Sequence, residues 1–186
     1  NPAFKRYNLD QLPQHAFYQG SVCDGQFLED IFQKHHFAKV VHLGARAGVR
    51  PSVQQPQLYE QVNFGGTKTL LTLASKYNVN QFIFGSTSAV YGNTTPLPFS
   101  EHATNLQPVS PYAKTKLTAE QLLQEQHARI GLPTTILRFF TVYGERGRPD
   151  MAPYLFTEAI FKHQPIKKFG AGSTSRDYTY IADIVA

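Results

Sequence analysis

The sequence predicts an α/β protein with a doubly wound parallel sheet, and three observations support this. Short runs of β-branched and aromatic residues alternate along the chain with longer segments of helical periodicity. The runs are apolar on both faces, which is typical of parallel strands covered by helices. Polar, glycine-containing segments follow three of the runs. Ligands of such sheets bind beyond the carboxyl ends of the strands, so we expect a binding site at those segments.

The individual elements follow from local composition. The helix predicted at 110–130 begins with Ser110 as its N-cap and Pro111 at its first position, and both residues are favoured there. The long helix predicted at 56–77 carries one apolar stripe, made up of Leu58, Val62, Leu70, Leu71 and Ala74. In chain order we predict strands at 16–19, 39–43, 81–84 and 134–139, and helices at 26–35, 56–77, 110–130 and 154–163.

One part of a dinucleotide-binding fold is missing from the sequence. Such folds open with a strand, a glycine-rich turn and a helix whose N-terminus holds a pyrophosphate. No turn with that pattern follows a strand here, because the spacing of Gly44 and Gly48 is wrong for it. The chain also stops abruptly after Tyr180, at the beginning of a further element. We therefore expect an internal segment of a longer protein, lacking the first strand and its glycine-rich turn.

Composition and charge exclude several classes of function. The net charge is +5, but the basic residues are scattered, so no nucleic-acid partner is expected. No apolar run approaches the roughly 20 residues that cross a bilayer, so no membrane segment is predicted. The single cysteine, Cys23, rules out an internal disulfide and indicates a reducing, cytoplasmic setting. We predict no metal site.

The first chemical motif is Tyr112-Ala113-Lys114-Thr115-Lys116, just inside the helix predicted at 110–130. Residues four apart lie on the same helical face, so Tyr112 and Lys116 are neighbours. A phenol titrates near ~10, and a neighbouring ammonium favours its ionised form, so Tyr112 becomes a candidate base. Taken alone, the motif also fits a solvated Tyr and Lys on an amphipathic helix.

The second motif supplies a hydroxyl at a strand end. Gly85-Ser86-Thr87-Ser88 follows the strand predicted at 81–84, and Val90-Tyr91-Gly92 comes shortly after it. A hydroxyl at this place can share a substrate oxygen with Tyr112 and complete a proton relay. A polar turn that ends at Gly92 is the structural alternative. The order and placement of the two motifs together favour a catalytic site.

With these motifs, the chain resembles the extended short-chain dehydrogenases/reductases, in particular the NAD-dependent nucleotide-sugar epimerases and dehydratases. Further segments in register with that family are His42-Leu43-Gly44-Ala45, Val62-Asn63-Phe64-Gly65-Gly66-Thr67 and Arg176-Asp177-Tyr178-Thr179-Tyr180-Ile181. The resemblance covers essentially the whole chain and implies a Rossmann-like, NAD(P)-binding fold. It also implies a catalytic triad of Thr87, Tyr112 and Lys116, with Tyr112 and Lys116 also contacting the NAD cofactor.

The resemblance implies binding roles for other residues. Gly44 and Ala45 would line the cofactor diphosphate, and Asn63 would lie near the cofactor. Arg176 would contact the substrate diphosphate through a charge-assisted hydrogen bond. Ser21 departs from the family pattern, since many relatives carry Asp at that position to hold adenine, and this leaves the adenine contact open.

Two positions after Thr87 distinguish members of the family. Dehydratases of this family typically carry the sequence Thr-Asp-Glu at this strand end. Enzymes that decarboxylate UDP-glucuronate tend to carry Glu two residues after the hydroxyl. This chain has Ser88 and Ala89 there, so the acids expected for elimination or decarboxylation are absent and epimerisation is favoured. The stretch 137–152 most resembles UDP-glucuronate 4-epimerases. Substrate contacts are therefore expected from Thr87, Ser88, Thr141, Arg148 and Arg176.

The expected function is the NAD-dependent 4-epimerisation of a UDP-hexose, UDP-glucuronate to UDP-galacturonate, by a homodimer. Two alternatives stay open: a UDP-glucose/galactose 4-epimerase, and a cofactor-binding fragment without catalysis. Residues 1–143 are expected to form a partial cofactor-binding domain, and residues 144–186 the start of a substrate-binding region and the return to the core. The resemblance places the dimer contact on the helices at 56–77 and 110–130. An isolated segment of this extent is expected to bind NAD weakly and to be inactive.

Overall fold

The computed structural model describes residues 7, 9–168, 170–172 and 175–186. The chain divides into two compact units. The larger unit is Gln19–Phe139, and the smaller unit comprises Asn1–Tyr18 and Phe140–Ala186. Among the described helices, none has both the length and the apolar character needed to cross a membrane.

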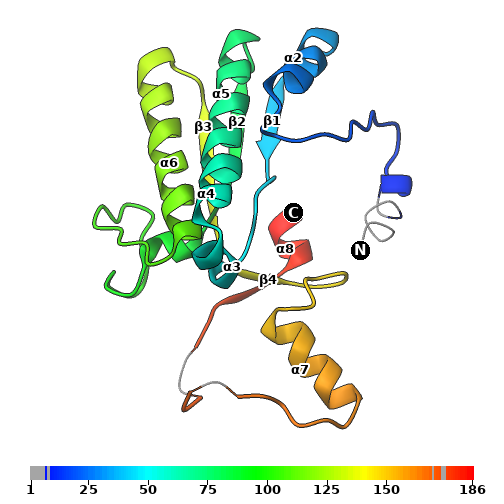
Figure 1. Cartoon of the computed structure of the whole chain (residues 1–186), viewed down its shortest axis with the longest axis vertical. Coiled ribbons are helices and arrows are strands. Elements are labelled where there is room, and N and C mark those ends of the chain that lie inside the picture. Colours follow the sequence, from blue (N-terminus) through cyan, green and yellow to red (C-terminus); the bar gives the residue numbers. More distant parts are fainter. Residues whose placement is uncertain (1–6, 8, 169, 173–174) are drawn as a thin grey trace. The chain divides into compact units, whose positions relative to one another are not determined.

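The larger unit contains a parallel sheet of three strands in the order β1-β2-β3, with β2 at its centre (Figure 1). The strands are β1 (Lys39–His42), β2 (Gln81–Thr87) and β3 (Thr134–Phe139). The helices of this unit are α2 (Gly25–Lys34), α3 (Val49–Gln54), α4 (Pro56–Tyr59), the π-helix η1 (Glu60–Gly65), α5 (Gly66–Lys76), the 3-10 helix η2 (Ser88–Tyr91) and α6 (Pro111–Ile130).

The core of the larger unit lies on one face of this sheet. Side chains alternate between faces along a strand, and Phe82 and Phe84 of β2 are fully buried on the same face. They pack in one cluster with residues of α2, α5 and α6, including Phe32 and Leu123. Helices α5 and α6 run side by side over β2 and β3 (Figure 1). Val41 is 57% exposed on the opposite face, so the second covering layer that the apolar strands predict is not among the described residues of this unit.

The single helix predicted at 56–77 is helical throughout but changes its geometry midway. Helix α4 passes into η1, where the hydrogen bonds span five residues, and η1 passes into α5. Asn63 lies within η1, and its fully buried side chain is hydrogen-bonded outside the helix. Such π turns are frequent at functional sites, and the structure places this one beside the loop after β1.

The smaller unit is built on a second, two-stranded parallel sheet. Strand β4 (Thr141–Tyr143) pairs with β5 (Tyr178–Tyr180), although the two are far apart in sequence. Helix α7 (Ala152–Phe161) lies between them in the chain, and α8 (Ile181–Val185) follows β5 directly. The rings of Tyr143 and Tyr180 are 5.6 Å apart between centroids.

The structure confirms most of the predicted elements and corrects others. The strand predicted at 16–19 is wrong, because these residues belong to no strand of the described structure and Phe17 is 59% exposed. Strand β2 extends three residues beyond its predicted end to Thr87, and α7 begins at Ala152 rather than Tyr154. Strands β4 and β5 and helix α3 were not predicted. Each has six residues or fewer, too short for periodicity to identify.

Candidate active site

Two neighbouring hydroxyls at the end of β2 have different surroundings. Ser86 is buried and donates its hydroxyl hydrogen bond to the carboxylate of Glu120 on α6. The next residue, Thr87, is half-buried. Its Oγ1 accepts a hydrogen bond of 3.2 Å from the backbone N–H of Ala89 and caps η2, which begins with the half-buried Ser88. Of the two hydroxyls, only that of Ser86 is held by α6.

Helix α6 begins where the sequence predicts. Ser110 is its N-cap, and its Oγ accepts a hydrogen bond of 3.1 Å from the backbone N–H of Ala113. Pro111 occupies the first helical position, where its missing N–H costs nothing. This start places Tyr112 in the first turn and Lys116 one turn later. The helix packs against both β2 and η2, so its first turns lie at the strand end that carries the hydroxyls.

The ammonium of Lys116 is directed at the end of β2 and not into solvent. Its Nζ donates a hydrogen bond of 2.6 Å to the carbonyl oxygen of Gly85, two residues before Thr87. Only 3% of the residue is exposed, and Nζ lies 4.5 Å from the centre of the Phe84 ring. Phe84 therefore provides both an apolar wall and a favourable cation–π contact.

The ring of Tyr112 rests against an anchored aromatic residue. Tyr59, the last residue of α4, is 1% exposed and donates its hydroxyl hydrogen bond to the carbonyl oxygen of Ala47 at 2.8 Å. The Tyr112 ring meets the Tyr59 ring edge-on, with centroids 6.3 Å apart and planes at 85°. The loop after β1 and helix α6 therefore meet through this pair of tyrosines.

Burial changes the protonation of two groups at this site. Burial lowers the pKa of Lys116 to about 8, and the negative charge of Glu120 opposes that change. Burial also lowers the pKa of His42 to about 4, and the positive charge of Lys116 adds to the effect. At neutral pH Lys116 is consequently a cation and His42 is neutral. The His42 Nε2 lies 3.0 Å from Thr67 Oγ1, whose own proton goes to the Asn63 carbonyl, so Nε2 is the donor.

Asn63 joins the loop after β1 to helix α6. Its side-chain oxygen accepts a 2.8 Å hydrogen bond from the backbone N–H of Arg46, and its amide nitrogen donates to the Arg46 carbonyl at 3.1 Å. The same nitrogen donates to Thr115 Oγ1 at 3.3 Å, and Thr115 Oγ1 donates to the carbonyl of Tyr112 at 2.8 Å. Asn63 thus holds the backbone that follows the exposed Gly44 and Ala45.

Sequence reasoning missed a buried ionic network next to Lys116. Glu120 is 1% exposed, and Arg138 of β3 binds its carboxylate through Nη2 at 2.7 Å and through Nε at 3.1 and 3.2 Å. Arg138 also donates to the hydroxyl of Tyr91 at 3.2 Å and lies over its ring at 5.0 Å. The available signal was spacing, because Tyr112, Lys116 and Glu120 follow one another at intervals of four along the helix.

Comparison with known proteins identifies the family. Residues 2–186 match the NAD dependent epimerase/dehydratase family. The chain belongs to this family. It is 44% identical over 183 residues to a UDP-glucuronate 4-epimerase of Thermodesulfobacterium geofontis, an alignment that covers 97% of this chain and 56% of that relative. The chain therefore spans about half the length of such relatives.

Solved structures of family members share the fold. A UDP-glucuronic acid 4-epimerase from Bacillus cereus, in complex with UDP-glucuronic acid and NAD, is 34% identical with a TM-score of 0.88, over 98% of this chain and 57% of that chain. A UDP-glucose 4-epimerase from Thermotoga maritima with UDP-glucose is 36% identical with a TM-score of 0.88, over 95% of this chain and 59% of that chain. The predicted family and the Rossmann-like parallel fold are confirmed.

The larger unit fits the NAD cofactor of the epimerase/dehydratase family. The Lys116 ammonium has three N–H bonds, and within the described residues a single acceptor, the Gly85 carbonyl, is hydrogen-bonded to it. Donors are therefore left for ribose hydroxyls at the end of β2. At the end of β1, Gly44 and Ala45 are exposed, and Asn63 fixes the backbone of the next residue, Arg46, so this segment is accessible and compatible with a diphosphate contact. Among the described residues, no group of three His, Cys, Asp or Glu side chains could hold a metal ion.

The remaining predicted substrate residues lie in the smaller unit. Thr141 is the first residue of β4 and is half-buried. Arg148 is exposed and pairs with Asp150 through two hydrogen bonds of 3.0 and 2.5 Å, which lower the pKa of that carboxyl. Arg176 is exposed and donates to the carbonyl of Ser175 at 2.7 Å. The roles of these three residues stay predictions.

Proposed function

We propose that the full-length protein is an NAD-dependent epimerase that inverts C4 of UDP-glucuronate to give UDP-galacturonate. The observation that carries the proposal is the buried ammonium of Lys116, held at the strand end that bears Thr87 and one helical turn from Tyr112. The names of the relatives support the substrate, since one is a UDP-glucuronate 4-epimerase and another was solved with UDP-glucuronic acid and NAD.

The chemistry follows from the proton equilibria of these three side chains. The Lys116 cation stabilises the phenolate of Tyr112, which otherwise forms only near pH ~10. Tyr112 then takes the proton of the C4 hydroxyl, and Thr87 shares a hydrogen bond with the same oxygen. NAD⁺, when bound, would supply the redox chemistry, as acceptor of the C4 hydride and, once reduced, as donor for its return. Tyr112 gives the proton back when the transient 4-keto sugar, turned over in the pocket, is reduced on its other face.

The surroundings of Thr87 favour epimerisation over elimination or decarboxylation. Ser88 and Ala89 provide no acid beside the hydroxyl, so neither position can supply a proton for loss of water or support loss of CO₂. The 4-keto form of UDP-glucuronate is a β-keto acid, and such acids lose CO₂ readily when the carboxylate lies perpendicular to the plane of the keto carbonyl. The enzyme must therefore hold the carboxylate in a different orientation. We assign this task to the hydroxyls of Thr87, Ser88 and Thr141, and the grip on the diphosphate to Arg148 and Arg176.

Product analysis of the full-length protein tests this assignment. We expect UDP-glucuronate and NAD to yield UDP-galacturonate, and a UDP-pentose as the product would overturn the proposal. Tyr112→Phe should remove nearly all turnover and leave binding of the UDP-sugar intact, because the phenol hydroxyl contributes to proton transfer rather than to the diphosphate contact. Retained turnover in that variant would refute Tyr112 as the base.

A UDP-glucose/galactose 4-epimerase is the second candidate. The similarity to the Thermotoga maritima enzyme with UDP-glucose favours it, since its TM-score equals that of the Bacillus cereus structure. Such an enzyme needs no grip on a carboxylate. The ratio of kcat/KM for UDP-glucuronate and UDP-glucose therefore separates the two candidates, and the neutral sugar should react faster if the second is correct.

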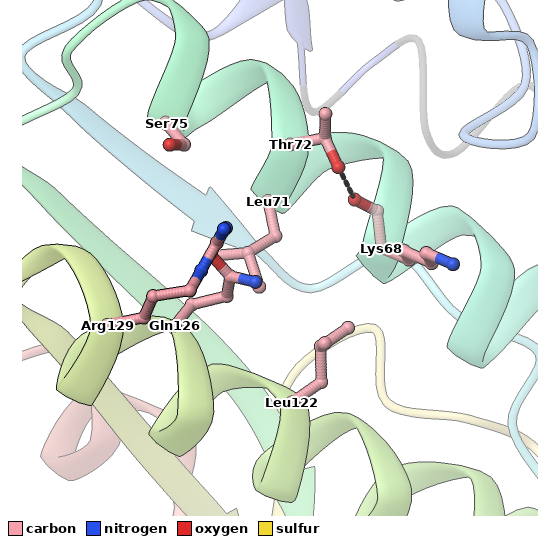
Figure 2. Close-up of a pocket in the computed structure, with 7 residues that line it drawn as sticks. All are labelled: Lys68, Leu71, Thr72, Ser75, Leu122, Gln126 and Arg129. Atoms are coloured by element: carbon pink, nitrogen blue, oxygen red, sulfur yellow. Dashed lines mark hydrogen bonds between the residues drawn. The ribbon is translucent and has the colours of Figure 1, made fainter.

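Three expectations accompany the proposed activity. We propose a cytoplasmic homodimer. In it, residues 1–143 form part of the cofactor-binding domain, and residues 144–186 form the start of the substrate-binding region and the return to the core. The dimer contact is assigned to the helical segment 56–77, which the structure divides into α4, η1 and α5, and to α6. Between α5 and α6 lies a cavity of about 110 Å³, and Figure 2 shows Leu71 and Leu122 facing into it with Lys68 and Arg129 at its margins. An apolar floor with a charged margin suits a partner helix.

A further inference from the structure

Glu120 of α6 and Arg138 of β3 form a buried ion pair one helical turn after Lys116. The proposed chemistry does not use this pair. Glu120 is almost fully buried, and Arg138 holds its carboxylate through hydrogen bonds of 2.7, 3.1 and 3.2 Å. The side chain of Arg138 is itself only 15% exposed. A buried ion pair seldom stabilises a fold more than apolar residues of the same volume would, so stability alone does not account for its position.

Glu120 and Lys116 hold consecutive residues of β2. Lys116 donates to the carbonyl oxygen of Gly85, and the carboxylate of Glu120 accepts the hydroxyl hydrogen bond of Ser86. The two side chains are one turn apart on α6, so they are neighbours on the helix. Together they attach α6 to the last residues of β2, immediately before Thr87.

We propose that Glu120 is a positioning residue that keeps Lys116 cationic and in place beside Tyr112, an inference that rests on the proposed epimerase function. The charged and titratable groups around Lys116 support it. His42 of β1 is neutral above its lowered pKa of about 4, and Arg138 of β3 is paired with Glu120. Burial lowers the pKa of Lys116, and Glu120 acts in the opposite direction. The carboxylate therefore favours the form of Lys116 that the phenolate of Tyr112 requires.

Titration of Lys116 in the full-length protein tests the coupling directly. Carbon NMR of protein labelled at lysine Cε follows each ammonium, and Lys116→Arg identifies the resonance. In Glu120→Gln we expect the midpoint of Lys116 to fall by about one pH unit, because a neighbouring negative charge is lost. Glu125→Gln makes the same change at an exposed position of α6 and should leave the midpoint in place. An unchanged midpoint in Glu120→Gln would overturn the proposal.

The pH profile of epimerisation then separates positioning from a structural role. We expect the alkaline limb of kcat in Glu120→Gln to move to lower pH together with the Lys116 midpoint. A structural role alone would lower kcat by the same factor at every pH, and that result would also overturn the proposal. If Glu120→Gln does not fold, the double variant Glu120→Gln with Arg138→Met removes both buried charges. The Lys116 midpoint should then fall in the same direction but by less, because the cation of Arg138 is lost together with the carboxylate, and an unchanged midpoint would overturn the proposal. A wild-type protein without epimerase turnover would refute the proposed function, whereas the NMR titration would still decide whether Glu120 acts on Lys116.

Discussion

Acid should destabilise this protein through His42, a buried histidine beside the candidate site. His42 is 3% exposed, contacts the rings of Phe82 and Phe84, and is hydrogen-bonded to Thr67. Burial holds its pKa at about 4 in the folded protein, against 6.5 for an unperturbed histidine. Between these two values the unfolded chain binds a proton that the folded protein does not bind. The free energy of unfolding therefore falls as the pH decreases from about 7 towards 4.

The size of this effect follows from the two pKa values. The interval from 6.5 to about 4 corresponds to about 3 kcal/mol once titration is complete, and about 2 kcal/mol of it is lost by pH ~5. His42→Gln keeps a side-chain N–H for Thr67 but does not titrate. Its free energy of unfolding should therefore fall by about 2 kcal/mol less than that of the wild type between pH ~7.5 and ~5.

Urea denaturation of the full-length protein at these two pH values measures the difference. His102→Gln, at an exposed position, serves as the control and should keep the wild-type dependence on pH. If His42→Gln loses as much stability in acid as the wild type, His42 is not kept neutral by burial. The description of the site as a cation beside a neutral imidazole would then be wrong.

Three further predictions concern the site and the assembly. Thr87→Ala should lower kcat by about 10²-fold because a partner of the C4 oxygen is lost, whereas Thr87→Ser should retain most activity in the same steady-state assay. Asn63→Ala removes a fully buried side chain and leaves the backbone of Arg46 without its partners, so calorimetry should show weaker NAD binding and denaturation a loss of about 2 kcal/mol; unchanged affinity would contradict the role of Asn63 in fixing this loop. Leu122→Glu should shift the proposed dimer to monomer in light scattering, while the exposed Gln124→Glu should not.

Local pattern was sufficient for the elements that carry the candidate chemistry. The apolar runs predicted β1, β2 and β3, and the Ser110-Pro111 pair predicted the first residue of α6. Because side chains four apart on a helix share a face, the neighbourhood of Tyr112 and Lys116 also followed from spacing alone. The family resemblance selected Thr87 over Ser86, and the structure adds a physical reason to prefer it, since the hydroxyl of Ser86 is engaged by Glu120.

Long-range contacts decided the rest. Burial of Lys116 and His42 depends on Phe84 and on the packing of α6 against β2, and no local pattern reports how much water reaches a lysine. The pairing of β4 with β5, the hydrogen bonds of Asn63 with Arg46 and the ion pair of Glu120 with Arg138 likewise join residues distant in sequence. Sequence therefore determined which chemical groups the chain carries and on which elements. Tertiary structure determined their charge states and partners, because desolvation and electrostatic coupling arise only when distant segments pack together.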